Sequence, residues 1–137
     1  MKLNKPVVLN DQVAIAEIPN QNEETKAGEI GLLTGWGLYG SGSPISKRLR
    51  KVNQTVVDIK ECKKVHELPI LESNICAGDP EGGKGQCNAD SGGPLFVNGK
   101  VVGIVSWSVK PCGIKGFPGV FTRVASYREW ILEHTGV

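Results

Sequence analysis

The stretch PLFVNGKVVGIVSW (94–107) consists of two apolar runs separated by Asn98 and Gly99. An Asn-Gly pair between apolar runs favours a tight type I′ turn, since both residues readily take positive φ. We therefore expect 94–97 and 100–107 to pair as an antiparallel hairpin. This hairpin indicates a β-rich fold and is the starting point for interpreting the rest of the chain.

Further short apolar runs, bounded by glycine, proline or polar residues, lie on both sides of the hairpin. They have the composition of β-strands and occupy 13–18, 29–37, 48–58, 73–78 and 118–124. We expect a short helix at 59–66 and a terminal helix that begins at a capping box, with Ser126 as N-cap and Glu129 at the third position. About six strands and one helix predict an all-β fold, a six-stranded antiparallel barrel closed by a C-terminal helix at 124–137.

The bulk properties of the 137-residue chain are those of one globular domain. Apolar residues make up 39% and charged residues 22%, and the formal net charge is only +2. A charge this small, without a long run of like charges, argues against partners such as nucleic acid or an anionic membrane. No stretch approaches the roughly 20 apolar residues of a membrane span, and the entry segment 1–11 lacks the apolar core of a signal peptide.

The cysteines Cys62, Cys76, Cys87 and Cys112 are even in number and include no C-x-x-C pair. Zinc sites usually contain such a pair, so the spacing disfavours a metal. Two disulfides are the better interpretation, and they imply an oxidising compartment and thus a secreted protein. Because no signal peptide is present, we expect the chain to be a fragment of a longer product or to have a start that was assigned late.

A glycine-rich loop at 79–93 carries the most informative motif, QCNADSGGPL (86–95). Long loops in compact domains are usually functional or disordered. In this loop Ser91 lies between Asp90 and two glycines, shortly after Cys87. This setting is typical of an activated nucleophile, and a serine hydroxyl needs a base within hydrogen-bond reach to act as one.

The chain resembles the C-terminal half of the chymotrypsin-like (trypsin-fold) serine endopeptidases. The motifs that carry the resemblance follow the order and spacing of that family, as do the four cysteines: TGWG (34–37), NICAG (74–78), CNADSGGPL (87–95), VGIVSW (102–107) and PGVFTRVASYREWI (118–131). The resemblance covers essentially the whole chain. It implies a hydrolase that cuts internal peptide bonds of protein substrates without a cofactor, and it implies the disulfides Cys62–Cys76 and Cys87–Cys112.

The resemblance also implies roles for residues of the serine loop. Ser91 matches the nucleophile, and the backbone N–H groups of Ala89 and Ser91 match the oxyanion hole, which stabilises charge developing on the substrate carbonyl. Asp90 matches the activation switch, a buried carboxylate that pairs with a new N-terminal ammonium after zymogen cleavage. The family nearly always has glycine where this chain has Ala89, and a Cβ there restricts the backbone.

A substrate pocket is implied between the stretches 85–88, 106–108 and 118–120. Its residues are Gly85, Gln86, Asn88, Ser106, Trp107, Ser108 and Gly119. Trypsin-like members have an aspartate at the pocket base, where this chain has Gly85, so we expect an uncharged substrate side chain. Gly119 leaves one wall open, which favours a chymotrypsin-like preference for large apolar or aromatic groups, with an elastase-like preference as the alternative. Ser106 and Trp107 are expected to flank the bound peptide backbone.

The base that Ser91 needs is not expected within this chain. The family order is His, Asp, Ser, and KLNKPVVLNDQVAIAEIP (2–19) resembles the segment after the triad aspartate, so both partners belong to an N-terminal barrel upstream. His66 is expected beside the pocket wall and His134 on the terminal helix, and neither position suits a general base. The G-x-S-x-G elbow of the α/β-hydrolases would need glycine at Ala89.

Two functions are compatible with these observations. The first is a serine endopeptidase domain that is inactive alone, works together with an N-terminal barrel and has protein protease inhibitors as further partners. The second is a non-catalytic homologue that binds peptides or proteins, which Ala89 and the missing upstream half both permit. In either case a lone half is expected to expose an apolar face.

Overall fold

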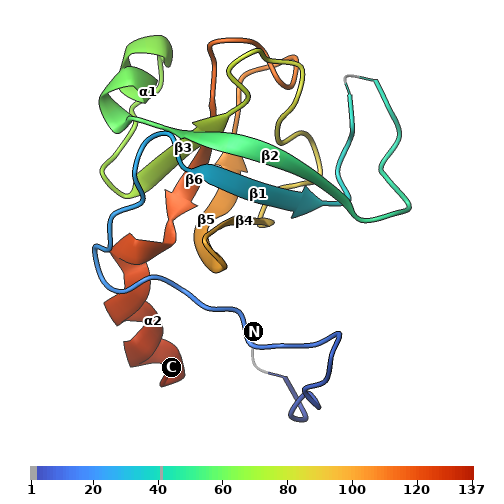
Figure 1. Ribbon diagram of the computed structural model, residues 1–137, viewed down its shortest axis with the longest axis vertical. Helices are drawn as coiled ribbons and strands as arrows, with labels where there is room; N and C mark the ends of the chain where they lie inside the picture. The colour runs from blue at the N-terminus through green and yellow to red at the C-terminus, as the bar shows by residue number, and fades with distance from the viewer. Residues whose placement is uncertain (1–2, 41) are drawn as a thin grey trace.

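The computed structural model describes residues 3–40 and 42–137 and shows a closed antiparallel barrel with a helix at its end. Its strands are β1 (Ile30–Gly35), β2 (Arg50–Val57), β3 (Asn74–Gly78), β4 (Pro94–Val97), β5 (Lys100–Trp107) and β6 (Gly119–Arg123). The helices are α1 (Ile59–Val65), the 3₁₀ helix η1 (Val124–Tyr127) and α2 (Arg128–Thr135). Strands adjoin in the order β1-β2-β3-β6-β5-β4, and β1 pairs with β4 (Figure 1). The expected six-stranded barrel with a C-terminal helix is confirmed.

The β4–β5 hairpin forms around the Asn-Gly turn. Asn98 has a φ of 50° and Gly99 a φ of 81°, as a type I′ turn requires. β4 and β5 then run antiparallel. The far end of β5 reaches the serine loop, where the Gly92 N–H donates to the Val105 carbonyl at 3.0 Å. The hairpin therefore connects the centre of the fold to the candidate site.

Apolar side chains from all six strands fill the barrel. They are Leu33, Val56, Ile75, Ala77, Leu95, Val97, Val102, Val105 and Phe121. Glycine at position 103 allows the strands to approach closely, because a Cβ on Gly103 would lie 3.0 Å from the Cβ of Phe121. A second buried cluster surrounds the Cys62–Cys76 disulfide, which fastens α1, the short helix expected near 59–66, to β3.

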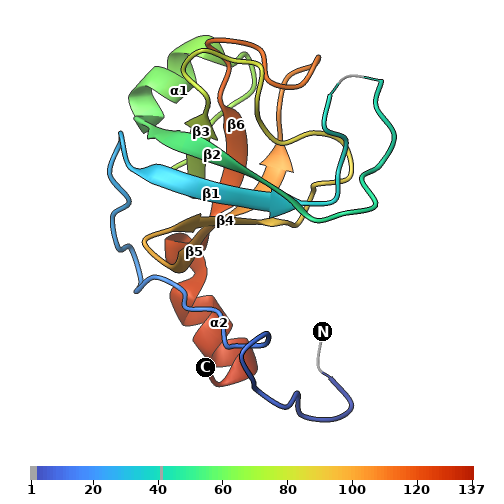
Figure 2. The same ribbon diagram turned by 45° about the vertical axis from the view of Figure 1, so that its right-hand side comes forward.

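The segment 13–18 does not form the strand that its alternating pattern predicts. Ile15 is 79% exposed, and the segment meets the barrel at an isolated bridge, where the Val101 N–H donates to the Glu17 carbonyl at 2.8 Å. A closed barrel offers no free edge along which another strand can pair. The segment instead runs below the barrel and past α2 (Figure 2).

The terminal helix begins without the predicted capping box. Ser126 lies within η1, where its hydroxyl accepts a hydrogen bond from Arg123 at 3.3 Å. α2 starts after Tyr127, which provides no side-chain cap. The Glu129 N–H donates instead to Oε1 of Gln21 at 3.0 Å. The prediction is wrong because the acceptor comes from a distant segment of the chain.

Candidate active site

The serine loop between β3 and β4 is tied to the barrel around Ser91. The Cys87–Cys112 disulfide joins it to the segment after β5, and Gly92 is hydrogen-bonded to Val105 of β5. Both disulfide pairings implied by the resemblance are therefore present. Ser91 itself is exposed, so the loop holds its hydroxyl at the surface of the barrel.

Ser91 is exposed, whereas the carboxylate of the neighbouring Asp90 turns into the protein and contacts the segment that follows β1. Its Oδ1 accepts from the Gly37 N–H at 2.8 Å, and its Oδ2 accepts from the Cys87 N–H at 3.0 Å. A Cβ on Gly35 or Gly37 would overlap this carboxylate, so glycine is required at both positions. A cavity of about 300 Å³ adjoins the carboxylate. Asp90 is thus held by backbone donors next to space for a further group.

The oxyanion hole that the resemblance implies would be formed by the backbone N–H groups of Ala89 and Ser91. Within the described part of the chain, the N–H groups of Asp90, Gly92 and Gly93 donate to backbone carbonyls, and no hydrogen bond engages those of Ala89 and Ser91. Ala89 has a φ of 69°, in the left-handed region that favours glycine. The Cβ of Ala89 makes this left-handed backbone conformation strained.

Replacing Ala89 by glycine is expected to stabilise the protein. The left-handed conformation costs an L-residue about 1–2 kcal/mol, whereas the greater freedom of glycine in the unfolded chain costs about 0.4–1 kcal/mol. We expect the free energy of unfolding in urea to rise by roughly 0.5–1 kcal/mol. The same change at exposed Ala27, which does not have positive φ, should lower it. An equal loss at both positions would contradict the strain at Ala89.

The structure brings together part of the expected substrate pocket. Four of its seven residues line one small cavity of about 20 Å³, namely Gly85, Gln86, Ser108 and Gly119. Trp107 is not among the lining residues, but its carbonyl oxygen accepts a hydrogen bond from Nε2 of Gln86 at 2.7 Å. Asn88 and Ser106 are exposed and do not line this cavity.

Gln54 and Asp79 are among the lining residues that sequence reasoning missed. Gln54 of β2 is buried, and its Oε1 lies 3.7 Å from where a Cβ on Gly85 would be. Asp79 accepts a hydrogen bond from the Glu81 N–H at 2.9 Å and lies 3.4 Å from Lys84. The Glu81 N–H, followed by Lys84, lowers the pKa of Asp79 below its ordinary value. Only the fold brings these residues to the pocket.

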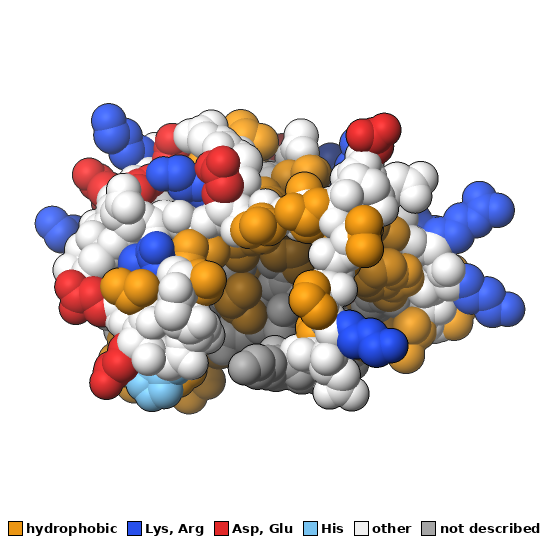
Figure 3. Space-filling view, turned by 90° about the horizontal axis from the view of Figure 1, so that it is seen from below, with side chains coloured by type: hydrophobic (Ala, Val, Ile, Leu, Met, Phe, Trp, Pro, Cys, Tyr) orange, Lys and Arg blue, Asp and Glu red, His pale blue; other side chains and the backbone are white. Residues whose placement is uncertain are grey.

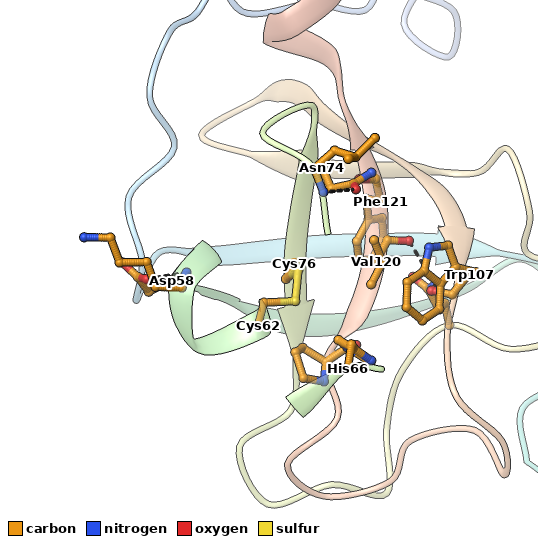
Figure 4. Close-up of a disulfide and its surroundings, with 12 residues drawn as sticks. Asp58, Cys62, His66, Asn74, Cys76, Trp107, Val120 and Phe121 are labelled. Carbon is orange, nitrogen blue, oxygen red and sulfur yellow. Dashed lines mark hydrogen bonds between the residues drawn. A yellow bond between two sulfur atoms is a disulfide. The ribbon is translucent and has the colours of Figure 1, made fainter. Parts of the chain in front are cut away.

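His66 is the C-cap residue of α1 (Figure 4) and is not among the residues that line this cavity. Its ring centroid is 5.0 Å from that of Trp107 and 6.0 Å from that of Phe117, both edge-on. Its Nε2 is 2.9 Å from the Pro118 carbonyl oxygen. His134, in contrast, stacks on a tryptophan of its own helix. Among the described residues, neither histidine is hydrogen-bonded to Ser91.

Within residues 3–40 and 42–137, the cysteines are all disulfide-bonded. The same residues contain no group of three or more His, Cys, Asp or Glu side chains arranged to hold a metal ion. None of their helices has the length and apolar character needed to cross a bilayer.

The closed barrel, the terminal helix and the disulfide-tied serine loop have the arrangement of the trypsin fold. The chain belongs to the trypsin family, whose model, described as Trypsin, matches residues 1–131. It is 38% identical over 137 residues to Kallikrein-1 of Mus musculus, covering 97% of this chain and 51% of that relative. It is 40% identical over 134 residues to Trypsin-4 of Rattus norvegicus, covering 97% of this chain and 53% of that relative. The chain thus spans about half the length of the curated relatives that it matches.

Proposed function

We propose that the chain supplies the nucleophile, the oxyanion hole and the substrate pocket of a serine endopeptidase. The observation that carries this proposal is the exposed Ser91 in a loop where the N–H groups of Ala89 and Ser91 have no partner among the described residues. Oγ of Ser91 attacks the scissile carbonyl carbon, and the two N–H groups stabilise the resulting oxyanion. The proposed general base of the N-terminal barrel takes the proton from Oγ and gives it to the amine that departs when the C–N bond breaks, and water then hydrolyses the acyl-enzyme ester.

Asp90 is the proposed switch for the formation of this site. Its carboxylate accepts two backbone hydrogen bonds and adjoins a cavity that has room for an ammonium group. Among the described residues the half-buried Asp90 forms no ion pair within 4.0 Å, although Arg50, Lys51 and Lys84 also line the cavity. A cation bound at the carboxylate would pair with it and would favour the conformation that contains the pair. The conformation of the loop around Ala89 and Ser91 would then depend on that cation.

The general base and its aspartate are proposed to come from an N-terminal barrel joined to this chain. An apolar groove of about 310 Å³ lies between the barrel and α2, lined by Ile104, Thr122, Val124, Tyr127, Trp130 and Ile131. Val8 and Ile15 of the N-terminal segment are 81% and 79% exposed. Figure 3 shows hydrophobic side chains around a hollow on this side of the molecule. Apolar surface of this kind is typical of an interface.

An extracellular location is part of the proposal, because two disulfides are stable in an oxidising compartment. The expected partners are protein substrates and protein inhibitors, both of which would approach the exposed Ser91.

The preferred substrate side chain depends on the pocket wall at Gly119. The sequence favours a large apolar or aromatic group, because glycine at this position leaves the wall open. In the structure, the Gln86 amide lies directly against Gly119. The Gln86 amide therefore reduces the size of the side chain that the pocket admits.

A peptide-binding homologue without catalysis is the second candidate function. The strained φ of 69° at Ala89 favours it, since the Cβ restricts the backbone that would donate to the oxyanion. The same pocket and loop would then hold a peptide without cleaving it.

Labelling and hydrolysis by the full-length gene product distinguish the two candidates. A fluorophosphonate probe should modify Ser91, and internally quenched peptides should be cleaved. The 137-residue chain alone should be slower by a factor on the order of 10⁶, the loss seen when a triad is incomplete. Peptide binding with neither labelling nor turnover in the full-length protein would support the binding homologue instead.

A further inference from the structure

The Gln86 side chain occupies the space in which a substrate side chain would have to fit. We propose that Gln86 closes the inner part of the pocket, so that the protein cleaves after residues with small, uncharged side chains and excludes aromatic and cationic ones. This inference rests on the proposed endopeptidase function and names its substrate class.

The direction of the Gln86 side chain is defined by its contact with Gly119. A Cβ built on Gly119 would lie 2.7 Å from both Cδ and Oε1 of Gln86. The space left by the missing side chain at position 119 is therefore already filled by the Gln86 amide. Glycine at this wall accommodates a residue of the protein itself instead of opening the pocket to a bulky ligand.

The Gln86 amide is fastened in this position. Its Nε2 donates to the Trp107 carbonyl at 2.7 Å and lies 3.4 Å from the Val120 carbonyl oxygen, and the residue is only 3% exposed. Swinging the amide out for a large substrate side chain would remove the donor from these two backbone acceptors. Buried carbonyl groups without a donor are unfavourable, so the closed position is the stable one.

Little room remains beyond Gln86. The cavity has a volume of about 20 Å³, enough for about one water molecule, whereas pockets for drug-sized ligands span about 300–1,000 Å³. Gln54 closes the far side, behind Gly85. Oε1 of Gln86 is buried and has no hydrogen-bond partner among the described residues. A methyl or hydroxymethyl group matches the remaining space, and an aromatic ring does not.

The charged residues at the cavity disfavour a cationic substrate side chain. Asp79 is the carboxylate that lines it, and its oxygens are engaged by the Glu81 N–H and by Lys84. Lys84 also lines the cavity and would repel a second cation. Neither Gln54 nor Gln86 supplies a compensating negative charge. The pocket is therefore suited to small neutral groups such as the side chains of alanine and serine.

Cleavage of matched peptides by the full-length protein tests this inference. The internally quenched peptides are identical except for the residue before the scissile bond, which is Ala, Ser, Phe, Tyr or Lys. We expect kcat/KM to be at least tenfold higher for Ala and Ser than for the other three. Gln86→Ser should raise kcat/KM for Phe at least tenfold, while Gln12→Ser at an exposed glutamine should keep the wild-type order. A wild-type preference for Phe, Tyr or Lys would overturn the inference.

A binding measurement separates this inference from the proposed function. Full-length protein with Ser91→Ala is titrated with 4-methylphenol, a mimic of the tyrosine side chain, and backbone amide signals of 85–88, 106–108 and 118–120 are followed by NMR. We expect no saturable shifts unless Gln86→Ser is also present. Saturable shifts at these amides with Gln86 intact would overturn the closed pocket. If no peptide is hydrolysed, the endopeptidase proposal and the cleavage preference that rests on it both fail, while the titration still decides whether Gln86 closes the pocket. If Gln86→Ser does not fold, the measurements with Gln86 intact still decide.

Discussion

Replacing Ser91 by alanine is expected to lower the kcat for peptide hydrolysis by the full-length protein by a factor on the order of 10⁶. The change removes the Oγ that forms the acyl-enzyme, and no other group in the loop can replace it as a nucleophile. Ser91 is exposed, and its side chain makes no hydrogen bond to any described residue. The fold should therefore be unaffected, and the loss should appear in kcat while the binding of substrate persists.

Progress curves with internally quenched peptides measure the effect, and thermal unfolding checks the fold. Ser73→Ala provides a matched control, because Ser73 takes part in the fold through its carbonyl, which accepts from the Arg123 N–H at 2.8 Å. The control should keep wild-type kcat. Hydrolysis that persists at a similar rate after Ser91→Ala would show that another residue carries the reaction.

The parts of the fold that were predictable from the sequence depend on local interactions. The β4–β5 hairpin follows from the positive φ that Asn98 and Gly99 adopt readily. A short helix was expected around Cys62, and α1 forms there. In both cases the residues that decide the conformation are neighbours in the chain. Local chemistry therefore specified both the type and the place of these elements.

The parts that were not predictable depend on distant partners. The alternation in 13–18 is compatible with a strand, but β1 and β4 already close the barrel and leave no edge for it. The capping box at Ser126 is locally plausible, but Gln21, 108 residues away from Glu129 in sequence, supplies the acceptor. In each case a tertiary contact replaced the local preference.

The candidate site divides in the same way. The motif around Ser91 was recognisable because its chemistry lies within ten consecutive residues. The shape of the pocket was not, since it depends on which way the Gln86 side chain turns and on Gln54, which reaches Gly85 from another strand. From the sequence, glycine at position 119 predicts an open pocket wall, but in the fold the Gln86 side chain fills that space.

Replacing Phe121 by alanine is expected to produce the largest loss of stability among single core changes. Phe121 is 0% exposed and lies in β6, where it pairs with Ile75 of β3 and Val105 of β5. Its removal takes apolar contacts from the two adjacent strands and leaves a cavity that a closed barrel cannot readily collapse. We expect the free energy of unfolding to fall by about 3–5 kcal/mol.

Equilibrium unfolding in urea, followed by circular dichroism, measures this loss. Domains of this kind are stable by about 5–15 kcal/mol, so Phe121→Ala should move the transition to a far lower urea concentration. Phe96→Ala is the matched control, since Phe96 is only partly buried and lies next to the fully buried Leu95, on the opposite face of β4. Its cost should be smaller than that of Phe121→Ala, because part of Phe96 already contacts solvent. Equal costs at the two positions would mean that the six strands do not share one interior around Phe121, which would contradict the closed barrel on which the serine loop is mounted.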